Sequence, residues 1–140
     1  MHSKLHGVPT VDVAILQKGY ERVLLVGKNA EEGKFRFPGA FFNPENDETY
    51  EDTAQRLIQK EVPGARYRDL HILKSCKISD WRYQKTGNSI ITLFMLATYD
   101  GGDATAGQGA DQVRWVTLQN LEKHVVESHL PLVAILKNRR

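Results

Sequence analysis

One stretch of the chain, which runs from a turn into a predicted helix, concentrates residue types that bind divalent cations and phosphates. The turn Phe37-Pro38-Gly39-Ala40 leads through a loop to Glu48, and the segment that follows contains Arg56 and Glu61. A turn with glycine exposes backbone carbonyls, and helix carboxylates can converge with them; hard cations prefer oxygens from such separate segments. A cation held there would bridge phosphates. The alternative from the residues alone is an ordinary strand, loop and capped helix.

The segment 49–61 has the apolar spacing of one helical face. Thr49 and Asp52 form a capping-box pattern at its start, and Pro63-Gly64 ends it. The inward-facing positions are Tyr50, Ala54, Leu57 and Ile58. We therefore expect a helix with well-marked ends that carries Arg56 and Glu61 on its later turns.

The remaining elements are predicted from apolar alternation and turn residues. Strands are expected at 10–17, 22–26, 35–37, 70–78, 89–99 and 112–116, and helices at 118–127 and 130–137. The first two strands form a hairpin, and the glycine-rich stretch 100–109 is expected to be a flexible loop. This order predicts an α/β fold with one domain at 10–140, preceded by a flexible segment at 1–9.

Composition limits the classes of function. The chain has 140 residues, 19 Lys and Arg against 17 Asp and Glu, and 41% hydrophobic residues, which excludes a disordered chain and suits one domain. The formal charge of +2 argues against a dedicated duplex-binding protein, which concentrates basic residues on one face. Cys76 has no second cysteine to pair with, and we recognise neither a signal peptide nor a membrane span, so a cytoplasmic location is expected.

The segment from the turn to the end of the helix resembles the Nudix box, G-x5-E-x7-R-E-U-x-E-E-x-G-U, in which U is a bulky aliphatic residue. Glu48 and Arg56 have the spacing of the first glutamate and the arginine, and Glu61 falls on the last glutamate. Ala40 stands in place of the second glycine of the family's turn. The resemblance implies a Nudix-type α/β/α sandwich with a mixed β-sheet, the box helix on one side and the C-terminal helices on the other. It also implies that Glu48, Arg56 and Glu61 form the catalytic set, with Arg56 orienting Glu48.

The helix departs from the family pattern at two of the three carboxylates that bind metal. Those positions are Leu57 and Lys60, and only Glu61 remains. Each replacement removes a negative charge within a few ångströms of the metal, so several tightly bound ions are not expected. Lys60 is either a solvated helix residue or a contact for a substrate phosphate.

A similar reduced set occurs in the GDP-mannose hydrolase branch, which keeps the last glutamate. That likeness implies one Mg²⁺ or Mn²⁺ held by Glu61 and the backbone carbonyl of Ala40, with a third ligand near Gln108 or Asp111. The histidine that this branch uses as a base falls near Ala110, so another group must act as the base. The candidates are Asp103, Gln108, Asp111 and Glu48.

Short segments are similar to the branch of bifunctional nicotinamide-mononucleotide adenylyltransferases and NAD-metabolism regulators, which handle ADP-ribose. The segments are Phe41-Phe42-Asn43, Asp80-Trp81-Arg82 and 107–115. The likeness implies that Phe35, Trp81 or Tyr83 stacks on a base, that Arg82 contacts a phosphate, and that Gln108 belongs to the substrate site. Packing within the sheet is the alternative for the aromatic residues.

These observations predict hydrolysis of the diphosphate linkage in a nucleoside diphosphate linked to another moiety, of ADP-ribose or nucleotide-sugar type, with Mg²⁺ or Mn²⁺. The alternative is a catalytically impaired Nudix fold that binds a nucleotide or a protein partner. The expected partner is a small nucleotide, with no nucleic acid duplex and no membrane, and a homodimer is left open. His124 and His129 are expected at the surface, and Cys76 is expected to be buried.

Overall fold

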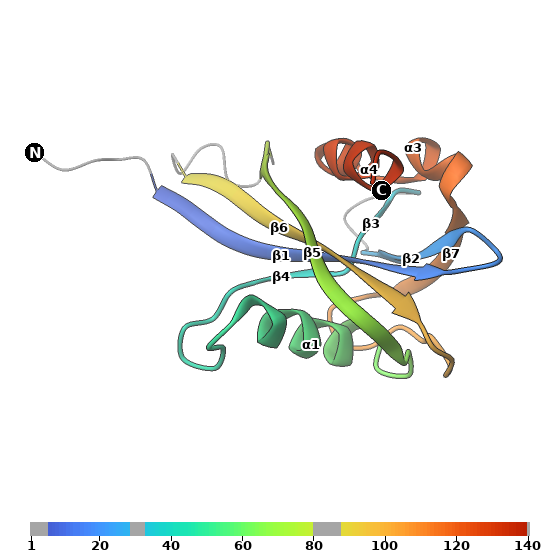
Figure 1. Cartoon of the computed structure of the whole chain (residues 1–140), viewed down its shortest axis with the longest axis horizontal. Coiled ribbons are helices and arrows are strands. Elements are labelled where there is room, and N and C mark those ends of the chain that lie inside the picture. Colours follow the sequence, from blue (N-terminus) through green and yellow to red (C-terminus); the bar gives the residue numbers. More distant parts are fainter. Residues whose placement is uncertain (1–5, 29–32, 80–87, 140) are drawn as a thin grey trace, which may run out of the picture.

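The computed structural model describes residues 6–28, 33–79 and 88–139, and Figure 1 shows a sheet between two helical layers. The strands are β1 (His6–Gln17), β2 (Arg22–Gly27), β3 (Phe35–Arg36), β4 (Gly39–Phe41), β5 (Tyr67–Ile78), β6 (Asn88–Tyr99) and β7 (Gln112–Thr117). The α-helices are α1 (Tyr50–Glu61), α3 (Leu121–His124) and α4 (Leu130–Lys137), with 3₁₀ turns η1 (Leu118–Asn120) and η2 (Glu127–His129).

Within the described residues the sheet has seven strands and is mixed. Its main order is β3-β2-β1-β6-β5, with β4 beside β1 and β7 beside β2. The long central strands β1 and β6 are parallel, whereas the other pairs are antiparallel. The structure thus confirms the expected hairpin of the first two strands and the mixed sheet of an α/β/α sandwich.

Two apolar cores lie on opposite faces of the sheet, as the alternation along β1 requires. Val11, Val13 and Ile15 face the core under α1, and Ala14 and Leu16 face the core under α3 and α4. Figure 1 shows α1 on one side of the sheet and the C-terminal helices on the other, as expected. β1 is therefore covered on both faces and forms a rigid base for any side chain that it carries.

Helix α1 begins and ends where the sequence pattern predicts. The Thr49 side chain accepts from the Asp52 N–H at 3.1 Å, and the Asp52 carboxylate accepts from the Thr49 N–H at 3.1 Å. This reciprocal pair is the predicted capping box. Val62 closes the other end with an N–H bond to the Ile58 carbonyl at 2.9 Å.

The structure differs from the predicted elements at several points, one of which is β5, which begins at Tyr67 instead of residue 70. β4 was not predicted, because its few residues have no pattern of their own and depend on pairing with 10–12 of β1. β1 begins at His6 because its first residues pair with 88–91 of β6. The helix expected at 118–127 breaks at Val125, where the backbone is extended and forms a bridge with Phe35.

The glycine-rich loop after β6 packs on the end of α1. The Gly107 N–H donates to the Glu61 carbonyl at 2.8 Å, and the Arg66 N–H donates to the Gly101 carbonyl at 2.8 Å. A Cβ at Gly107 would overlap the carbonyl of Lys60, so glycine permits this close approach. The loop is therefore held against the helix end that carries Glu61.

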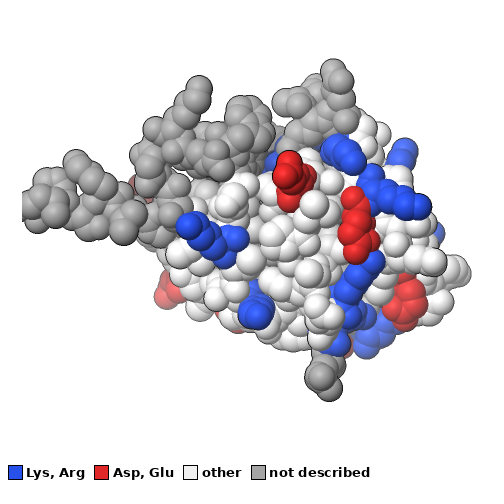
Figure 2. Space-filling view, turned by 90° about the horizontal axis from the view of Figure 1, so that it is seen from above, with Lys and Arg blue, Asp and Glu red and all other residues white. Residues whose placement is uncertain are grey.

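The surface shows both signs of charge. On the α3 and α4 side, Figure 2 shows Lys and Arg interspersed with Asp and Glu among the described residues. This mixture matches the near-balance of charge in the sequence. Among the described residues, no helix is long and apolar enough to cross a membrane.

Candidate active site

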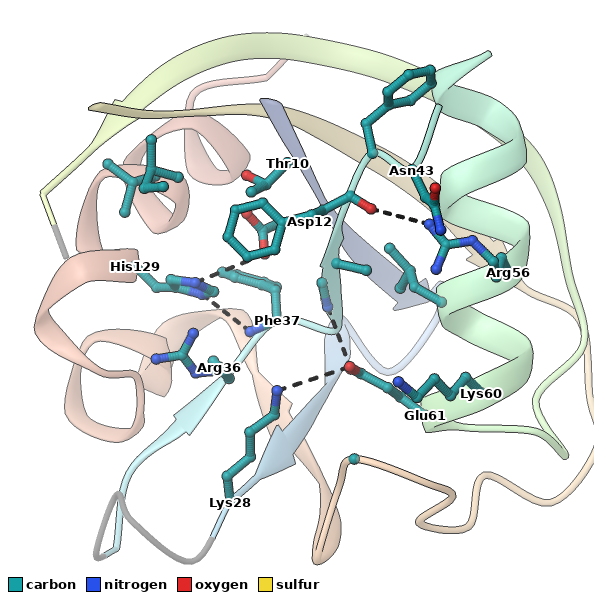
Figure 3. A pocket seen from close by; sticks show the side chains of 18 of the residues that line it. Thr10, Asp12, Lys28, Arg36, Phe37, Asn43, Arg56, Lys60, Glu61 and His129 are labelled. Carbon is teal, nitrogen blue, oxygen red and sulfur yellow. Dashed lines mark hydrogen bonds and ion pairs between the residues drawn. The ribbon is translucent and has the colours of Figure 1, made fainter. Parts of the chain in front are cut away.

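A cavity of about 540 Å³ opens where β1, the turn before β4 and the last turns of α1 meet (Figure 3). Its charged and polar lining residues are Thr10, Asp12, Lys28, Arg36, Asn43, Arg56, Lys60, Glu61 and His129. Ala40 and Gly109 also line it. The structure thus brings together three residues of the predicted site, Arg56, Glu61 and Ala40.

Glu61 is the last residue of α1 and is only 5% exposed. Its Oε1 accepts the Gly39 N–H at 3.3 Å, and its Oε2 lies 3.9 Å from the Lys28 Nζ. Burial raises the pKa of the Glu61 carboxyl, while Lys28 and the Gly39 N–H act in the opposite direction. These contacts hold the carboxyl group beside Gly39 and Ala40 at the start of β4.

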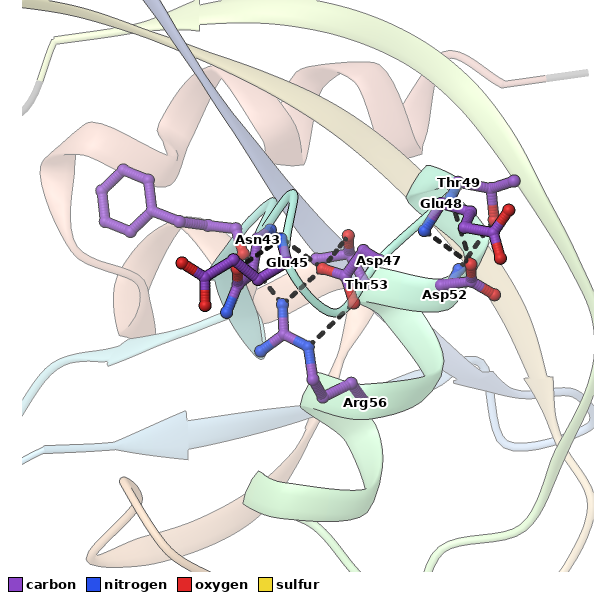
Figure 4. Close-up of polar contacts among 9 residues, drawn as sticks. Asn43, Glu45, Asp47, Glu48, Thr49, Asp52, Thr53 and Arg56 are labelled. Carbon is purple, nitrogen blue, oxygen red and sulfur yellow. Dashed lines mark hydrogen bonds and ion pairs between the residues drawn. The ribbon is translucent and has the colours of Figure 1, made fainter.

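Arg56 fixes the loop that precedes α1 (Figure 4). Its Nε donates to Asp47 Oδ1 at 3.1 Å, and its Nη2 donates to Asp47 Oδ2 at 2.7 Å and to the Phe41 carbonyl at 3.0 Å. Asp47 Oδ2 also accepts from the Thr53 hydroxyl and the Asn43 N–H, each at 2.9 Å. The Arg56 guanidinium holds the pKa of Asp47 well below its usual range.

The partner expected for Arg56 was Glu48, and the structure corrects this to Asp47. A tight turn in which the Asp47 N–H donates to the Asn43 carbonyl at 2.7 Å directs the Asp47 side chain inward. Glu48 is exposed at the start of α1, where its N–H donates to Asp52 Oδ2 at 3.0 Å. Figure 4 places Glu48 with Thr49 and Asp52, away from Arg56, and Glu48 does not line the cavity.

Several residues of the lining were missed by the sequence analysis, among them Lys28, Asp12 and His129. Asp12 of β1 is 8% exposed; its Oδ2 accepts from the Thr92 hydroxyl at 2.6 Å, and its Oδ1 lies 3.8 Å from His129 Nε2. His129 was expected at the surface but is 3% exposed, because its ring stacks on Phe37 with centroids 5.8 Å apart. A carboxylate within an apolar strand was a usable signal for Asp12, whereas nothing in the sequence marked His129.

The contacts of His129 define its role in this geometry. Its Nδ1 accepts the Phe37 N–H at 3.2 Å, so that nitrogen carries no proton in this arrangement. A neutral ring then carries its proton on Nε2, which faces Asp12. His129 therefore ties the C-terminal part of the chain to the turn before β4, and the lone pair of its Nδ1 is already used.

Other predicted site residues lie outside the cavity lining. Phe35 is 2% exposed and packs under the Arg114 guanidinium, which lies 4.9 Å from the ring centroid. Gln108 is exposed, next to Gly109 of the lining. Asp103 and Asp111 are also exposed; the Asp103 backbone lies against Gly64, and the Asp111 N–H donates to the Gly27 carbonyl at 2.8 Å. Trp81, Arg82 and Tyr83 lie outside the described residues.

The donor set of the cavity suits one divalent ion at most. Among the described residues, no three His, Cys, Asp or Glu side chains converge on a point. Of the two carboxylates in the lining, Asp12 accepts from the Thr92 hydroxyl, and Glu61 accepts the Gly39 N–H at the start of β4. The Ala40 carbonyl is the backbone oxygen proposed from the sequence as a metal ligand. Mg²⁺ is commonly bound by one or two carboxylates together with substrate phosphates and water. The residues present therefore fit an ion that shares its coordination with a phosphate.

Comparisons with known proteins identify the family. The family model described as NUDIX domain matches residues 7–134, so the chain belongs to this family. A search of curated proteins gave no match.

Solved structures share the fold at low sequence identity. The NUDIX domain of Shewanella oneidensis NrtR in complex with ADP ribose is 20% identical with a TM-score of 0.73, covering 94% of this chain and 87% of that one. MutT from Aliivibrio salmonicida and Vibrio cholerae is 20% identical with a TM-score of 0.67, covering 94% and 97%. A bifunctional NMN adenylyltransferase/ADP ribose pyrophosphatase from Francisella tularensis is 19% identical with a TM-score of 0.71, covering 98% of this chain and 42% of that one.

Proposed function

We propose that this Nudix protein hydrolyses the diphosphate linkage of a nucleoside diphosphate joined to another moiety. The observation that carries the proposal is the buried Glu61 carboxyl group beside Gly39 and Ala40 of β4, in a cavity lined by several Lys and Arg side chains. A diphosphate is an anion that such a cavity attracts, and the cavity has room for a small ligand. Hydrolysis is the activity that family membership favours.

One divalent ion, Mg²⁺ or Mn²⁺, is part of the proposal, with the Glu61 carboxylate and the Ala40 carbonyl as its protein ligands. When bound, such an ion polarises a diphosphate and lowers the pKa of a bound water. The Francisella tularensis relative has been solved in complex with AMP and a manganese ion. In this chain the Gly39 N–H holds the Glu61 carboxylate in place, which favours a preorganised ligand.

The other two predicted catalytic residues receive supporting roles. Arg56 binds Asp47 and the Phe41 carbonyl and so positions the loop along the cavity. Glu48 is exposed at the helix start and outside the lining, so we propose that its backbone N–H supports the helix start through Asp52 and that its side chain does not transfer a proton. The glycine-rich loop at 100–109, in which Gln108 precedes Gly109 of the lining, is the proposed source of a further substrate contact.

For the substrate, we propose ADP-ribose or a nucleotide sugar. Phe41 is 40% exposed and lines the cavity, so it is a better candidate for stacking on a base than the buried Phe35. The Shewanella oneidensis domain binds ADP ribose, and the Francisella tularensis protein is an ADP ribose pyrophosphatase. ADP-ribose is therefore the first substrate to test.

The test measures products from ADP-ribose, GDP-mannose and a nucleotide panel in the presence of Mg²⁺ or Mn²⁺. We expect turnover of at least one diphosphate compound and a loss of about 100-fold or more in kcat for Glu61→Gln, because the single carboxylate ligand is removed. Glu51→Gln on the exposed side of α1 is the matched control and should retain activity. Unchanged turnover of the Glu61→Gln variant would exclude the metal assignment.

A second candidate function is nucleotide binding without hydrolysis. It is favoured by Leu57, which is fully buried and continues the apolar core, and by Lys60, since both stand where the family has metal-binding glutamates. If ADP-ribose binds equally well with a chelator and no compound of the panel is hydrolysed, this function replaces the first.

A further inference from the structure

Two lysines from different elements flank Glu61 in the cavity. Lys28, directly after β2, has its Nζ 3.9 Å from Glu61 Oε2, and its side chain is 31% exposed. Lys60 precedes Glu61 in α1 and attracts its carboxylate electrostatically. Figure 3 shows both lysines at the end of the cavity where Glu61 lies. The family's second metal-binding glutamate is thus replaced by an ammonium group that lines the same cavity.

The glycine-rich loop at 100–109 leaves Lys60 and Glu61 accessible from the cavity. Gly109 lines the cavity with a φ of +89°, and a Cβ there would lie 3.8 Å from the Lys60 Cε and 3.9 Å from Glu61 Oε2. Glycine accepts this backbone conformation, and its missing side chain leaves space over both groups. A ligand that enters the cavity can therefore reach the ammonium groups.

The charge of the lining favours an anion. Its cationic side chains are Lys28, Arg36, Arg56 and Lys60, and its carboxylates are Asp12 and Glu61. Arg56 is paired with Asp47, whose carboxylate lies 2.7 Å from the Arg56 Nη2 and is not among the lining residues. Among the described residues Lys60 forms no salt bridge within 4.0 Å, so its charge remains directed at solvent or a ligand.

We propose that Lys28 and Lys60 bind the diphosphate of the ligand directly, so that the site holds a nucleoside diphosphate without a divalent ion. The inference rests on the proposed function only for the class of ligand. A lysine ammonium is a compact charge with three donors on a flexible stem, which suits the oxygens of two adjacent phosphates. In this chain the ammonium groups therefore supply charge that metal ions supply where the helix carries more glutamates.

The test is calorimetry of ADP and of inorganic pyrophosphate with the full chain in the presence of EDTA. ADP should bind under these conditions, and AMP, with one phosphate, should bind more weakly. Lys28→Gln and Lys60→Gln should each weaken ADP binding by about 10-fold to 100-fold, because each removes charge-assisted hydrogen bonds. Lys28→Arg and Lys60→Arg should keep most of the affinity, since the charge is retained.

Lys18→Gln is the matched control, because Lys18 is an exposed lysine in the turn between β1 and β2. Urea unfolding of each variant distinguishes lost binding from lost stability. The proposal is overturned if ADP fails to bind in EDTA, or if Lys28→Gln and Lys60→Gln bind ADP as tightly as Lys18→Gln does.

The Lys60→Glu variant best distinguishes metal-free diphosphate binding from the proposed metal-dependent hydrolysis. It restores a family glutamate, so chelator-resistant binding of ADP should fall while binding in the presence of Mn²⁺ should rise relative to Lys60→Gln. Chelator-resistant binding without turnover of any substrate would refute the hydrolytic proposal and leave this one intact. Turnover together with binding that strictly requires Mn²⁺ would refute this one and leave hydrolysis intact.

Discussion

Asp47 is buried at the entrance to α1, with four donors directed at its carboxylate. Two come from Arg56, and the others are the Thr53 hydroxyl and the Asn43 N–H. Such donors stabilise the ionised form, which is why the pKa of Asp47 lies below its usual range. The loop between β4 and α1 is therefore held by the Asp47 carboxylate, which is ionised at neutral pH.

The pH dependence of stability follows from this lowered pKa. A carboxyl whose pKa is lowered on folding stabilises the protein above its unfolded pKa of about 4, and this contribution is lost as the pH falls toward the lower folded value. Asp47→Asn should therefore unfold more easily than the wild type at pH 7, and the difference should shrink in acid. Urea unfolding as a function of pH measures it.

Glu48→Gln is the control for this experiment, since Glu48 is exposed and does not contact Arg56. Its stability should follow the wild type at every pH. If Glu48→Gln rather than Asp47→Asn removes the pH-dependent part of the free energy of unfolding, the pairing of Arg56 with Asp47 is wrong.

At the scale of elements, α1 serves two purposes along one helix. Its inner face packs on the sheet through Ala54, Leu57 and Ile58, while its last turn brings Lys60 and Glu61 to the cavity. Because the core fixes the rotation of the helix, it also fixes where Glu61 emerges. The packing of α1 is thus a condition for the site.

Leu57→Ala should lower the free energy of unfolding by about 2–5 kcal/mol, because Leu57 is fully buried and its removal leaves a cavity. Urea unfolding checks this value. Gln55→Ala, at an exposed position of the same helix, should change stability by less than about 0.5 kcal/mol. Similar values for the two variants would contradict the packing of α1 described above.

At the scale of the whole molecule, the cavity is closed by segments that are far apart in the sequence. Phe37 and His129 are 92 positions apart and are joined by the hydrogen bond from the Phe37 N–H. Phe35 and Val126 add a second link, in which the Val126 N–H donates to the Phe35 carbonyl at 2.8 Å. The C-terminal part of the chain therefore helps to hold the segment that leads into β4 and Ala40.

His129→Leu should lower stability by roughly 1–3 kcal/mol, because the buried Phe37 N–H would lose its acceptor. We also expect weaker ADP binding, since the turn before β4 loses a support. His124→Leu is the matched control on α3, and His129→Asn offers a replacement acceptor. Unfolding and calorimetry measure both effects, and equal losses in His129→Leu and His124→Leu would argue against this link.

The sequence by itself determined the features whose physics is local. The ends of α1 depend on a capping box and on Pro63-Gly64, and the two faces of β1 depend on alternation within a few residues. Family resemblance through Glu48, Arg56 and Glu61 was sufficient for the fold class, which the family match confirms. The placement of Glu61 and Ala40 in one cavity agrees with the predicted site, while their binding of metal stays a prediction.

Only the tertiary structure decided the contacts between distant segments. The β4 strand exists because it pairs with β1, and His129 is buried because its ring stacks on Phe37. Arg56 pairs with Asp47 rather than Glu48 because a tight turn directs one carboxylate inward and leaves the next exposed. Lys28 meets Glu61 through the packing of β2 near α1, and no local pattern encodes that distance. Packing between distant segments therefore determines which charged side chains line the cavity.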